Sequence, residues 1–335
     1  MNEVPDAPTT DRWVAPVLSA LDDALATLDS HGPECFNRAL ADALATLREA
    51  AGPAWTADVV PIVRRHRATQ IARECPLTRH ATVWPRGYPG DAGLLDIIYR
   101  HQPGDGRDLS ERARRLHAAI QAGAPPRSVR QRRMLLADAI DEAAVATPGV
   151  EIMSVACGHL REAEWSLALA GNGISRFIAA DQDRDSLSRL DADYGARFPV
   201  IAPTPLSVRD LLSGKTATLG RFNLIYAAGL FDYLPEAIAR ALTERLFGLL
   251  HPGGRLLIGN FGVGIPETAF MEAVMDWPLL WRSPVEIAAF ASGIADSDVA
   301  SKVVWPDATG TCWYLDIRRR SALASQAADA MRALS

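Results

Sequence analysis

The chain has 335 residues, of which 48% are hydrophobic, and this is enough to bury the core of one large domain or two smaller ones. Its 35 Lys and Arg residues stand against 40 acidic residues, so the formal net charge is −5. Without a general excess of positive charge, we do not expect nucleic acid as a partner. No signal-peptide pattern and no apolar run of about 18 residues is found, which predicts a cytoplasmic protein that does not insert into membranes.

The four cysteines do not indicate a disulfide framework or a metal site. They are far apart and form no C-x-x-C pair, and none has a histidine at metal-ligand spacing: Cys35, Cys75, Cys157 and Cys312. We therefore expect reduced thiols and no bound metal.

Residues 1–148 are predicted to form an all-helical cap domain. Apolar side chains recur at helical spacing, as in Leu18, Leu21, Leu25, Leu28 and in Phe36, Leu40, Leu44, Leu47. Further helices are predicted over 54–73, 110–121 and 128–146. The stretch 84–91 is rich in Gly and Pro and is predicted to be a loop.

Residues 149–335 are predicted to form an α/β domain with a doubly wound, Rossmann-like sheet of seven strands. Short β-branched runs at 150–156, 176–180, 200–206, 222–227 and 255–260 alternate with helical patterns, including a helix that starts at Pro235 and stops before 251–254. Residues 303–305 and 312–317 then predict a C-terminal antiparallel hairpin. The last fifteen residues are rich in Ala and predict a helix.

The first predicted strand runs into a turn of small residues, where a ligand can approach the backbone. Ser154 ends the strand, and Ala156, Cys157 and Gly158 form the turn before the next helix. Only one glycine is present, so this turn alone is also compatible with an ordinary strand-to-helix connection.

Asp181 at the end of the second strand strengthens the prediction of a nucleotide site. It follows Gly158 by 23 residues, close to the separation imposed by one β-α-β unit, and its carboxylate can accept both ribose hydroxyls of an adenosine cofactor. Gln182 is the next residue and is predicted to contact the same cofactor. Asp210 follows the third strand and could accept from an adenine amino group or be an ordinary surface acid.

The fourth predicted strand ends in a second small-residue turn, at Ala227 and Gly229, followed by the acidic and aromatic pair Asp232 and Tyr233. Ligands of open α/β sheets bind at this edge. The two turns and Asp181 therefore predict one binding site along the carboxyl ends of the strands.

In this arrangement the chain resembles the class I S-adenosylmethionine-dependent methyltransferases over residues 150–318. Within them it is similar to a bacterial subgroup that includes the enzymes making 3-hydroxypalmitate methyl ester signals. The motifs that carry this resemblance are 86–91 with Ile98-Tyr99, the 154–162 turn, 228–234, Gly259-Asn260 and Trp281-Arg282. The resemblance implies S-adenosylmethionine as the cofactor.

The sequence departs from the family pattern at the first turn. Ala156 replaces a usual glycine, His159 and Leu160 stand where small residues or proline are usual, and Ser154 replaces the acid that holds the cofactor amine. His159 would lie near the methionine end of the cofactor and has a suitable unperturbed pKa for a general base. Asp232 and Tyr233 are the alternatives, although alignment alone can supply much of the rate.

Substrate contacts are predicted at two places outside the cofactor turns. The loop with Arg86, Tyr88 and Asp91, followed by Tyr99, is either part of an active-site lid or a structural turn whose Asp91 caps the next helix. Trp277, Trp281 and Arg282 form either a wall that could hold an acidic or planar substrate or part of a packed amphipathic helix.

Two other functions stay open beside methyl transfer to a small molecule. One is a cofactor-binding regulator or partner subunit without catalysis. The other is a nicotinamide-dependent reductase, which would need a fuller G-x-G-x-x-G turn. The acceptor atom, whether of a carboxylate, a hydroxyl or a nitrogen, is not determined by the sequence, and a homodimer is compatible with it.

Overall fold

The computed structural model describes residues 11–100, 109–214 and 219–321. The chain divides into two compact units: a helical unit of residues 1–129 and 264–279, and a sheet unit of residues 130–263 and 280–335. Each unit is described by itself below. The helix predicted for the last fifteen residues lies outside the described residues.

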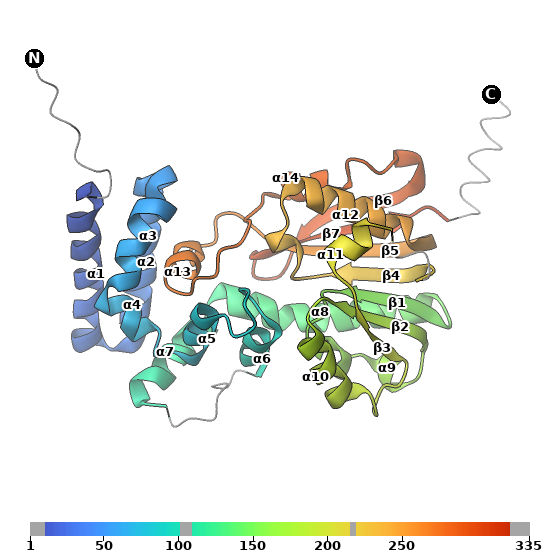
Figure 1. The fold of residues 1–335 in the computed structure, drawn as a ribbon, viewed down its shortest axis with the longest axis horizontal. Coiled ribbons are helices and arrows are strands. Elements are labelled where there is room, and N and C mark those ends of the chain that lie inside the picture. Colours follow the sequence, from blue (N-terminus) through green and yellow to red (C-terminus); the bar gives the residue numbers. More distant parts are fainter. Residues whose placement is uncertain (1–10, 101–108, 215–218, 322–335) are drawn as a thin grey trace, which may run out of the picture. The chain divides into compact units, whose positions relative to one another are not determined.

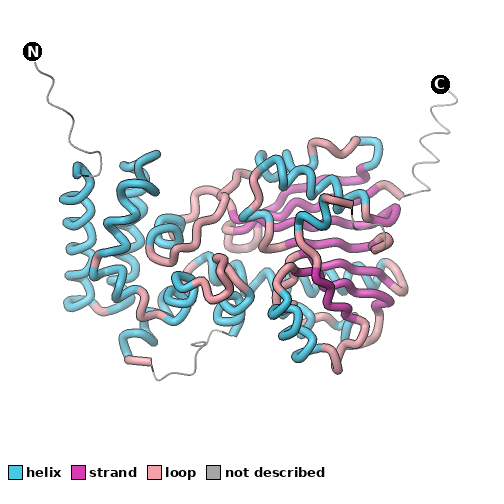
Figure 2. Tube along the Cα trace, in the orientation of Figure 1, coloured by secondary structure: helices cyan, strands magenta, loops and turns pink. Residues whose placement is uncertain are grey.

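The helical unit contains no strand among its described residues (Figure 2). Its elements are α1 (Asp11–His31), α2 (Pro33–Ala51), η1 (Gly52–Ala54), η2 (Trp55–Val59), α3 (Val60–Arg65), α4 (Arg67–Ala72), α5 (Pro76–Val83), α6 (Ala92–Arg100), α7 (Glu111–Gln121), the start of α8 (Ala124–Ala146) and α13 (Thr268–Ala273). None of the helices in the described part of the chain is long and apolar enough to cross a membrane.

The predicted helix over 54–73 is interrupted in the structure. At His66 the backbone is extended, with ψ of 148°, and the imidazole accepts from the backbone N–H of Ala68, so a new helix starts there. The apolar face predicted for α2 is buried as expected. In α1 the buried face is instead formed by Val17, Leu21 and Ala24, and Leu18 is exposed.

The sheet unit has seven strands in the order β3-β2-β1-β4-β5-β7-β6 (Figure 1). They are β1 (Val150–Val155), β2 (Ile174–Asp181), β3 (Ile201–Pro205), β4 (Phe222–Ala227), β5 (Leu250–Phe261), β6 (Val299–Pro306) and β7 (Cys312–Arg319). The first five pair in parallel, whereas β7 is antiparallel to both β5 and β6. The doubly wound sheet with its C-terminal hairpin is therefore confirmed.

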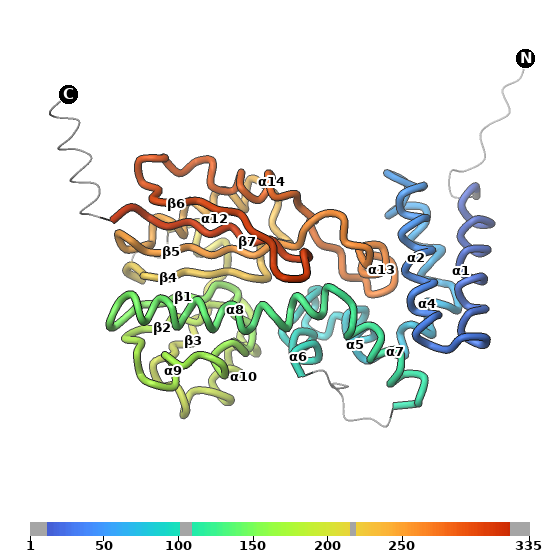
Figure 3. The backbone as a smooth tube through the Cα atoms, turned by 180° about the vertical axis from the view of Figure 1, so that it is seen from behind, coloured from blue at the N-terminus to red at the C-terminus, as the bar shows by residue number. Residues whose placement is uncertain are grey.

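Helices cover both faces of this sheet, because alternate strand residues point to opposite sides. On one face, Leu136 and Ile140 of α8 pack with Ile152, Leu224 and Tyr226, and Figure 3 shows α8 running across this face. On the other face, Leu242 and Leu246 of α12 (Glu236–Gly248) pack against alternate residues of β1, β4 and β5. The remaining elements are η3 (Arg161–Glu164), α9 (Leu167–Ala170), α10 (Arg184–Tyr194), α11 (Val208–Leu212), η4 (Phe231–Tyr233), α14 (Pro284–Ala288), η5 (Ala289–Ala291) and η6 (Asp296–Asp298).

The division of the chain differs from the predicted boundary at residues 148 and 149 in two respects. The greater part of α8 belongs to the sheet unit, since its apolar side chains complete the core over β1. Residues 264–279 belong to the helical unit, where the Glu272 carboxylate accepts from Arg48 Nε at 2.8 Å and from Trp55 Nε1 at 2.7 Å. Residues 264–279 follow β5 in the chain, and no local pattern in their sequence predicts that they belong to the helical unit.

Candidate functional site

The turn after β1 has an unusual backbone. Ala156, Gly158 and Leu160 all have positive φ, at 53°, 54° and 50°, and two of them are not glycine. A side chain in this left-handed region costs about 1–2 kcal/mol. The turn is fixed from the neighbouring strand, since the Cys157 N–H donates to the carbonyl of Ala180 at 3.1 Å.

Asp181 ends β2 and ties this turn to the second strand. Its carboxylate accepts from the backbone N–H of Gly158 at 2.8 Å and from that of Asp183 at 2.9 Å. The side chain is buried, and burial raises its pKa while the two N–H donors oppose the rise. An acid therefore lies directly against the glycine of the turn, and Gln182 beside it is exposed.

Glu162 is a second buried acid on the other side of the same turn. Its Oε1 accepts from the Tyr226 hydroxyl at 2.8 Å, and Tyr226 also hydrogen-bonds Ser154. Burial raises the pKa of the Cys157 thiol, and the charges of Asp181 and Glu162 raise it further. The Cys157 thiol is therefore held in its protonated form.

Arg132 of α8 lies at the same edge of the sheet, and it is not among the site residues predicted from the sequence. Its guanidinium is buried and donates to the carbonyl of Ala228, in the turn after β4. Its charge also acts on Glu162, lowering the pKa that burial raises. The signal for this residue was its position: Arg132, Leu136 and Ile140 lie one turn apart, so a cation stands on the apolar face of the helix.

Small residues allow neighbouring groups to approach the end of β4 closely. Ala227 is buried, and Gly229 follows in the turn, where an added Cβ would lie 3.5 Å from Arg132 Nη1. On the neighbouring strand, a Cβ at Gly259 would lie 3.4 Å from the Cα of Ala228. The two strand ends therefore approach closely, beside the turn that follows β1.

Asp232 follows this turn in η4 and is buried. Its Oδ1 accepts from the backbone N–H of Phe261 at 2.7 Å. Burial raises the pKa of Asp232 to about 6, although the Phe261 N–H and the charges of Arg132 and Arg282 act in the opposite direction. Tyr233, the next residue, is half-buried.

Two predicted site residues have other local roles in the structure. Asp210 closes a capping box at the start of α11: its Oδ2 accepts from Ser207 Oγ at 2.6 Å, and the Asp210 N–H donates to Ser207 Oγ at 3.1 Å. His159 is half-buried in the first turn. A contact of either residue with a ligand stays a prediction.

Arg282 is occupied by the protein itself. Its Nη1 donates to the carbonyl of Phe231 at 2.8 Å and to Asn260 Oδ1 at 2.7 Å, and its Nη2 donates to the carbonyl of Leu234. The buried guanidinium thereby fixes the segment that holds Asp232. Trp281 is half-buried and packs edge-on against Phe261, with ring centroids 6.0 Å apart. Both residues are packed but lie between α13 and α14, outside either helix, and a substrate contact of either one stays a prediction.

In the helical unit, the predicted loop over 84–91 is present, and Asp91 caps the helix that follows it. Its buried Oδ1 accepts from the backbone N–H of Leu94 at 2.8 Å and lies 2.9 Å from His80 Nε2. The loop needs left-handed backbone at Gly87 and Gly90. Arg86, Tyr88 and Tyr99 are half-buried, and their substrate contacts stay a prediction.

Comparison with known proteins identifies the fold. No model of a known protein family matches the chain, and no curated protein matches it. Among solved structures, a possible exported protein from Bordetella parapertussis is 17% identical, with 78% of this chain and 99% of that chain covered and a TM-score of 0.56. A candidate methyltransferase from Thermobifida fusca YX is also 17% identical, with 71% and 100% covered and a TM-score of 0.50. These likenesses show the fold alone, a Rossmann-like methyltransferase fold with a seven-stranded sheet.

Proposed function

We propose that this chain transfers a methyl group from S-adenosylmethionine to a small-molecule acceptor. The observation that carries the proposal is a pair of buried acids at the turn after β1: Asp181, which accepts from the Gly158 N–H, and Glu162, which accepts from the Tyr226 hydroxyl. This turn lies at the switch point of the sheet, between β1 and β4, where open α/β folds bind their ligands.

The charge of this turn discriminates between nucleotide cofactors. A dinucleotide places its anionic pyrophosphate against the first turn of such a fold, and two buried carboxylates would repel it. S-adenosylmethionine has no phosphate. Its ribose hydroxyls are donors and its ammonium and sulfonium are cations, so these groups suit an acidic turn, whereas its single carboxylate would have to point away from the two acids.

The residues present fit this cofactor. Asp181 would accept the ribose hydroxyls, as its place at the end of β2 predicts. Ser154 has no negative charge with which to bind the cofactor amine. Glu162 would bind this amine instead, because the Tyr226 hydroxyl hydrogen-bonds both Glu162 and Ser154. The left-handed turn at Ala156 and Gly158 would leave the backbone approachable.

When bound, S-adenosylmethionine supplies a methyl group on a positively charged sulfur. The chain's contribution is then alignment and removal of a proton from the acceptor. Asp232 is the best-suited group for that proton, since a pKa of about 6 leaves it mostly ionised at pH 7 while keeping it a stronger base than an ordinary carboxylate. His159 and Tyr233 stay the alternatives.

Incubation with methyl-labelled S-adenosylmethionine and a cell extract tests this function. We expect label to enter compounds that pass a small-molecule filter, in an amount that depends on wild-type protein and falls with Asp181→Ala. Asp191→Ala, which removes an exposed carboxylate from α10, is the matched control. Label found only in protein or nucleic acid would contradict the small-molecule acceptor.

The role of Glu162 can be separated from that of Asp181 with two ligands. S-adenosylhomocysteine has both the nucleoside and the amino-acid part, whereas 5′-methylthioadenosine lacks the amine. We expect Glu162→Gln to weaken binding of the first ligand by about tenfold or more and to leave the second unchanged. Equal losses for both ligands would mean that Glu162 only supports Tyr226.

A further inference from the structure

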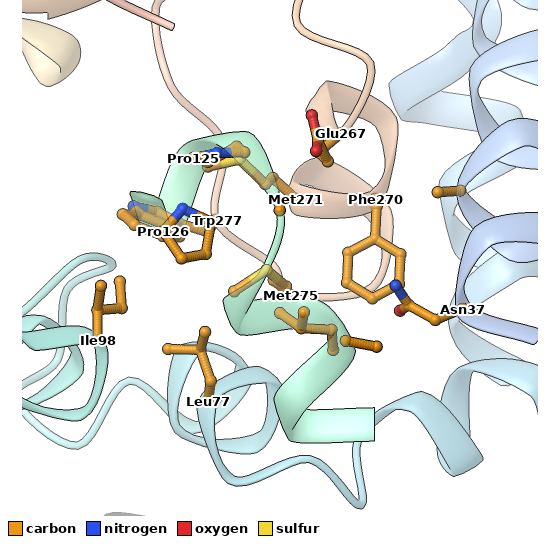
Figure 4. Close-up of a pocket in the computed structure, with 14 residues that line it drawn as sticks. Asn37, Leu77, Ile98, Pro125, Pro126, Glu267, Phe270, Met271, Met275 and Trp277 are labelled. Atoms are coloured by element: carbon orange, nitrogen blue, oxygen red, sulfur yellow. The ribbon is translucent and has the colours of Figure 1, made fainter. Parts of the chain in front are cut away.

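The helical unit contains an apolar pocket, and Trp277 is the one residue of the predicted substrate wall that lines it. It has about 510 Å³ of empty space, part of it open to solvent. Figure 4 shows its labelled side chains coming from α2, α5, α6, the first turn of α8, and α13 with the residues before and after it. All the residues that line it belong to the helical unit.

The walls of this pocket are mostly hydrocarbon and thioether. Leu77, Ile98, Phe270, Met271 and Met275 all line it. Interiors pack with few voids larger than a water molecule, whereas ligand pockets have mostly apolar walls with a few polar groups. Methionine adapts its shape to different ligands, so this pocket has the character of a site for an apolar molecule.

Within the described part of the chain, two buried acceptors in the pocket have no hydrogen-bond partner. Glu267 Oε1 accepts from the backbone N–H of Ala124 at 3.2 Å, which orients the carboxylate. Its Oε2 is buried without a hydrogen bond, and so is Asn37 Oδ1 on α2. Native proteins rarely leave buried polar atoms unsatisfied, and each such atom calls for an explanation.

We propose that this pocket binds an apolar molecule that carries a protonated amine. The hydrocarbon part would lie against the methionines and Phe270, and the ammonium would donate to Glu267 Oε2. An ammonium has three donors, so it can satisfy more than one acceptor. A fatty carboxylate is disfavoured, because it would set a second anion beside Glu267. The proposal concerns binding alone and does not rest on methyl transfer.

Isothermal titration with octylamine and octanoate tests this site on the full-length protein. The two probes share a chain of eight carbons and differ in the charge of the head group. We expect octylamine to bind with one site per chain and octanoate to bind at least tenfold more weakly. Equal affinity for the two probes, or no binding of octylamine, would overturn the proposal.

Substitutions assign the binding to this pocket. Glu267→Gln keeps an acceptor for the Ala124 N–H but removes the charge, and we expect it to lower octylamine affinity by about tenfold to hundredfold. Glu49→Gln, an exposed position on α2, is the matched control and should leave the affinity unchanged. An unchanged affinity in Glu267→Gln would contradict the proposed contact.

A second variant keeps the test decisive if Glu267→Gln does not fold. Ala41 of α2 lines the pocket, and Ala41→Leu fills part of it without touching the carboxylate. We expect octylamine binding to fall at least tenfold in this variant, with S-adenosylhomocysteine binding as in the wild type. Full octylamine binding in a folded Ala41→Leu protein would locate the amine elsewhere.

Discussion

Asp181 in the sheet unit and Asp91 in the helical unit were both predicted to bind ligands, and both accept backbone N–H groups. They differ in their surroundings. Asp181 ends a parallel strand at the switch point and shares the turn at Cys157 with a second buried acid. Asp91 begins a helix and has His80 as its neighbour. Hydrogen bonds to the backbone are therefore common to both acids, and the proposed ligand role of Asp181 depends on its position in the fold and on the nearby charges.

The largest expected effect concerns Arg282. Its substitution tests whether the sheet edge also contains residues that stabilise the fold without contacting a ligand. We expect Arg282→Ala to destabilise the protein by about 3–5 kcal/mol, because it leaves three buried oxygen atoms without their donor and removes one of the two cations that act on Asp232. Urea denaturation measures the loss. Exposed Arg184→Ala is the control, and a stable Arg282→Ala protein with impaired substrate affinity would support the predicted substrate wall.

The pH dependence of Asp232 gives the next effect. Its pKa is about 6 in the folded protein against 3.8 ordinarily, so both states are protonated below pH 3.8 and the wild type loses stability as the pH rises through 6. Asp232→Asn keeps an acceptor for the Phe261 N–H and escapes this loss. We expect the variant to be more stable at pH 8 by up to about 3 kcal/mol and no more stable at pH 3.5. A difference that does not change with pH would contradict a raised pKa.

Asp91 and Tyr88 sharpen the comparison from the helical unit. Asp91→Ala should cost about 0.5–2 kcal/mol, the usual loss for a helix N-cap, measured as a lower melting temperature. Tyr88→Ala, half-buried in the same loop, should fold normally and lower kcat/KM if the loop contacts substrate. S-adenosylhomocysteine affinity should be unchanged in both. An Asp91→Ala protein as stable as the wild type would contradict the capping role.

The smallest effect is expected at Ala156, where the sequence departs from glycine. Ala156→Gly removes the cost of a left-handed side chain but adds backbone entropy to the unfolded chain, so we expect a gain of about 0.5 kcal/mol. Ala179→Gly, in the buried strand β2, should lower stability. A loss of stability in Ala156→Gly would show that the methyl group contributes packing that outweighs the strain.

The sequence predicted those parts of the molecule that depend on local periodicity. The alternation of strands and helices after residue 149, the face of α2 and the place of Asp181 at the end of β2 follow from short-range patterns. The missed features depend on distant contacts. Arg132 reaches a carbonyl 96 residues away, and the assignment of residues 264–279 to the helical unit has no local signal.

The same limit explains why site residues were harder to assign than strands. An arginine after a tryptophan can line a substrate or tie down a turn, and only the carbonyls around Arg282 show that it fixes the segment with Asp232. Glu162 lies in the predicted turn 154–162, but its hydrogen-bonded link to Ser154 depends on Tyr226 from a different strand. Side chains brought together from several strands have no common pattern in the sequence.

Titration calorimetry with S-adenosylhomocysteine and with NADH, on the wild type and on Asp181→Ala, tests the central claim most directly. We predict one S-adenosylhomocysteine site per wild-type chain, a loss of about 1.5–3 kcal/mol of binding free energy in Asp181→Ala, and no binding of NADH. Asp191→Ala should bind as the wild type does. Binding of NADH, or S-adenosylhomocysteine binding that a folded Asp181→Ala protein retains in full, would contradict the account of the acidic turn.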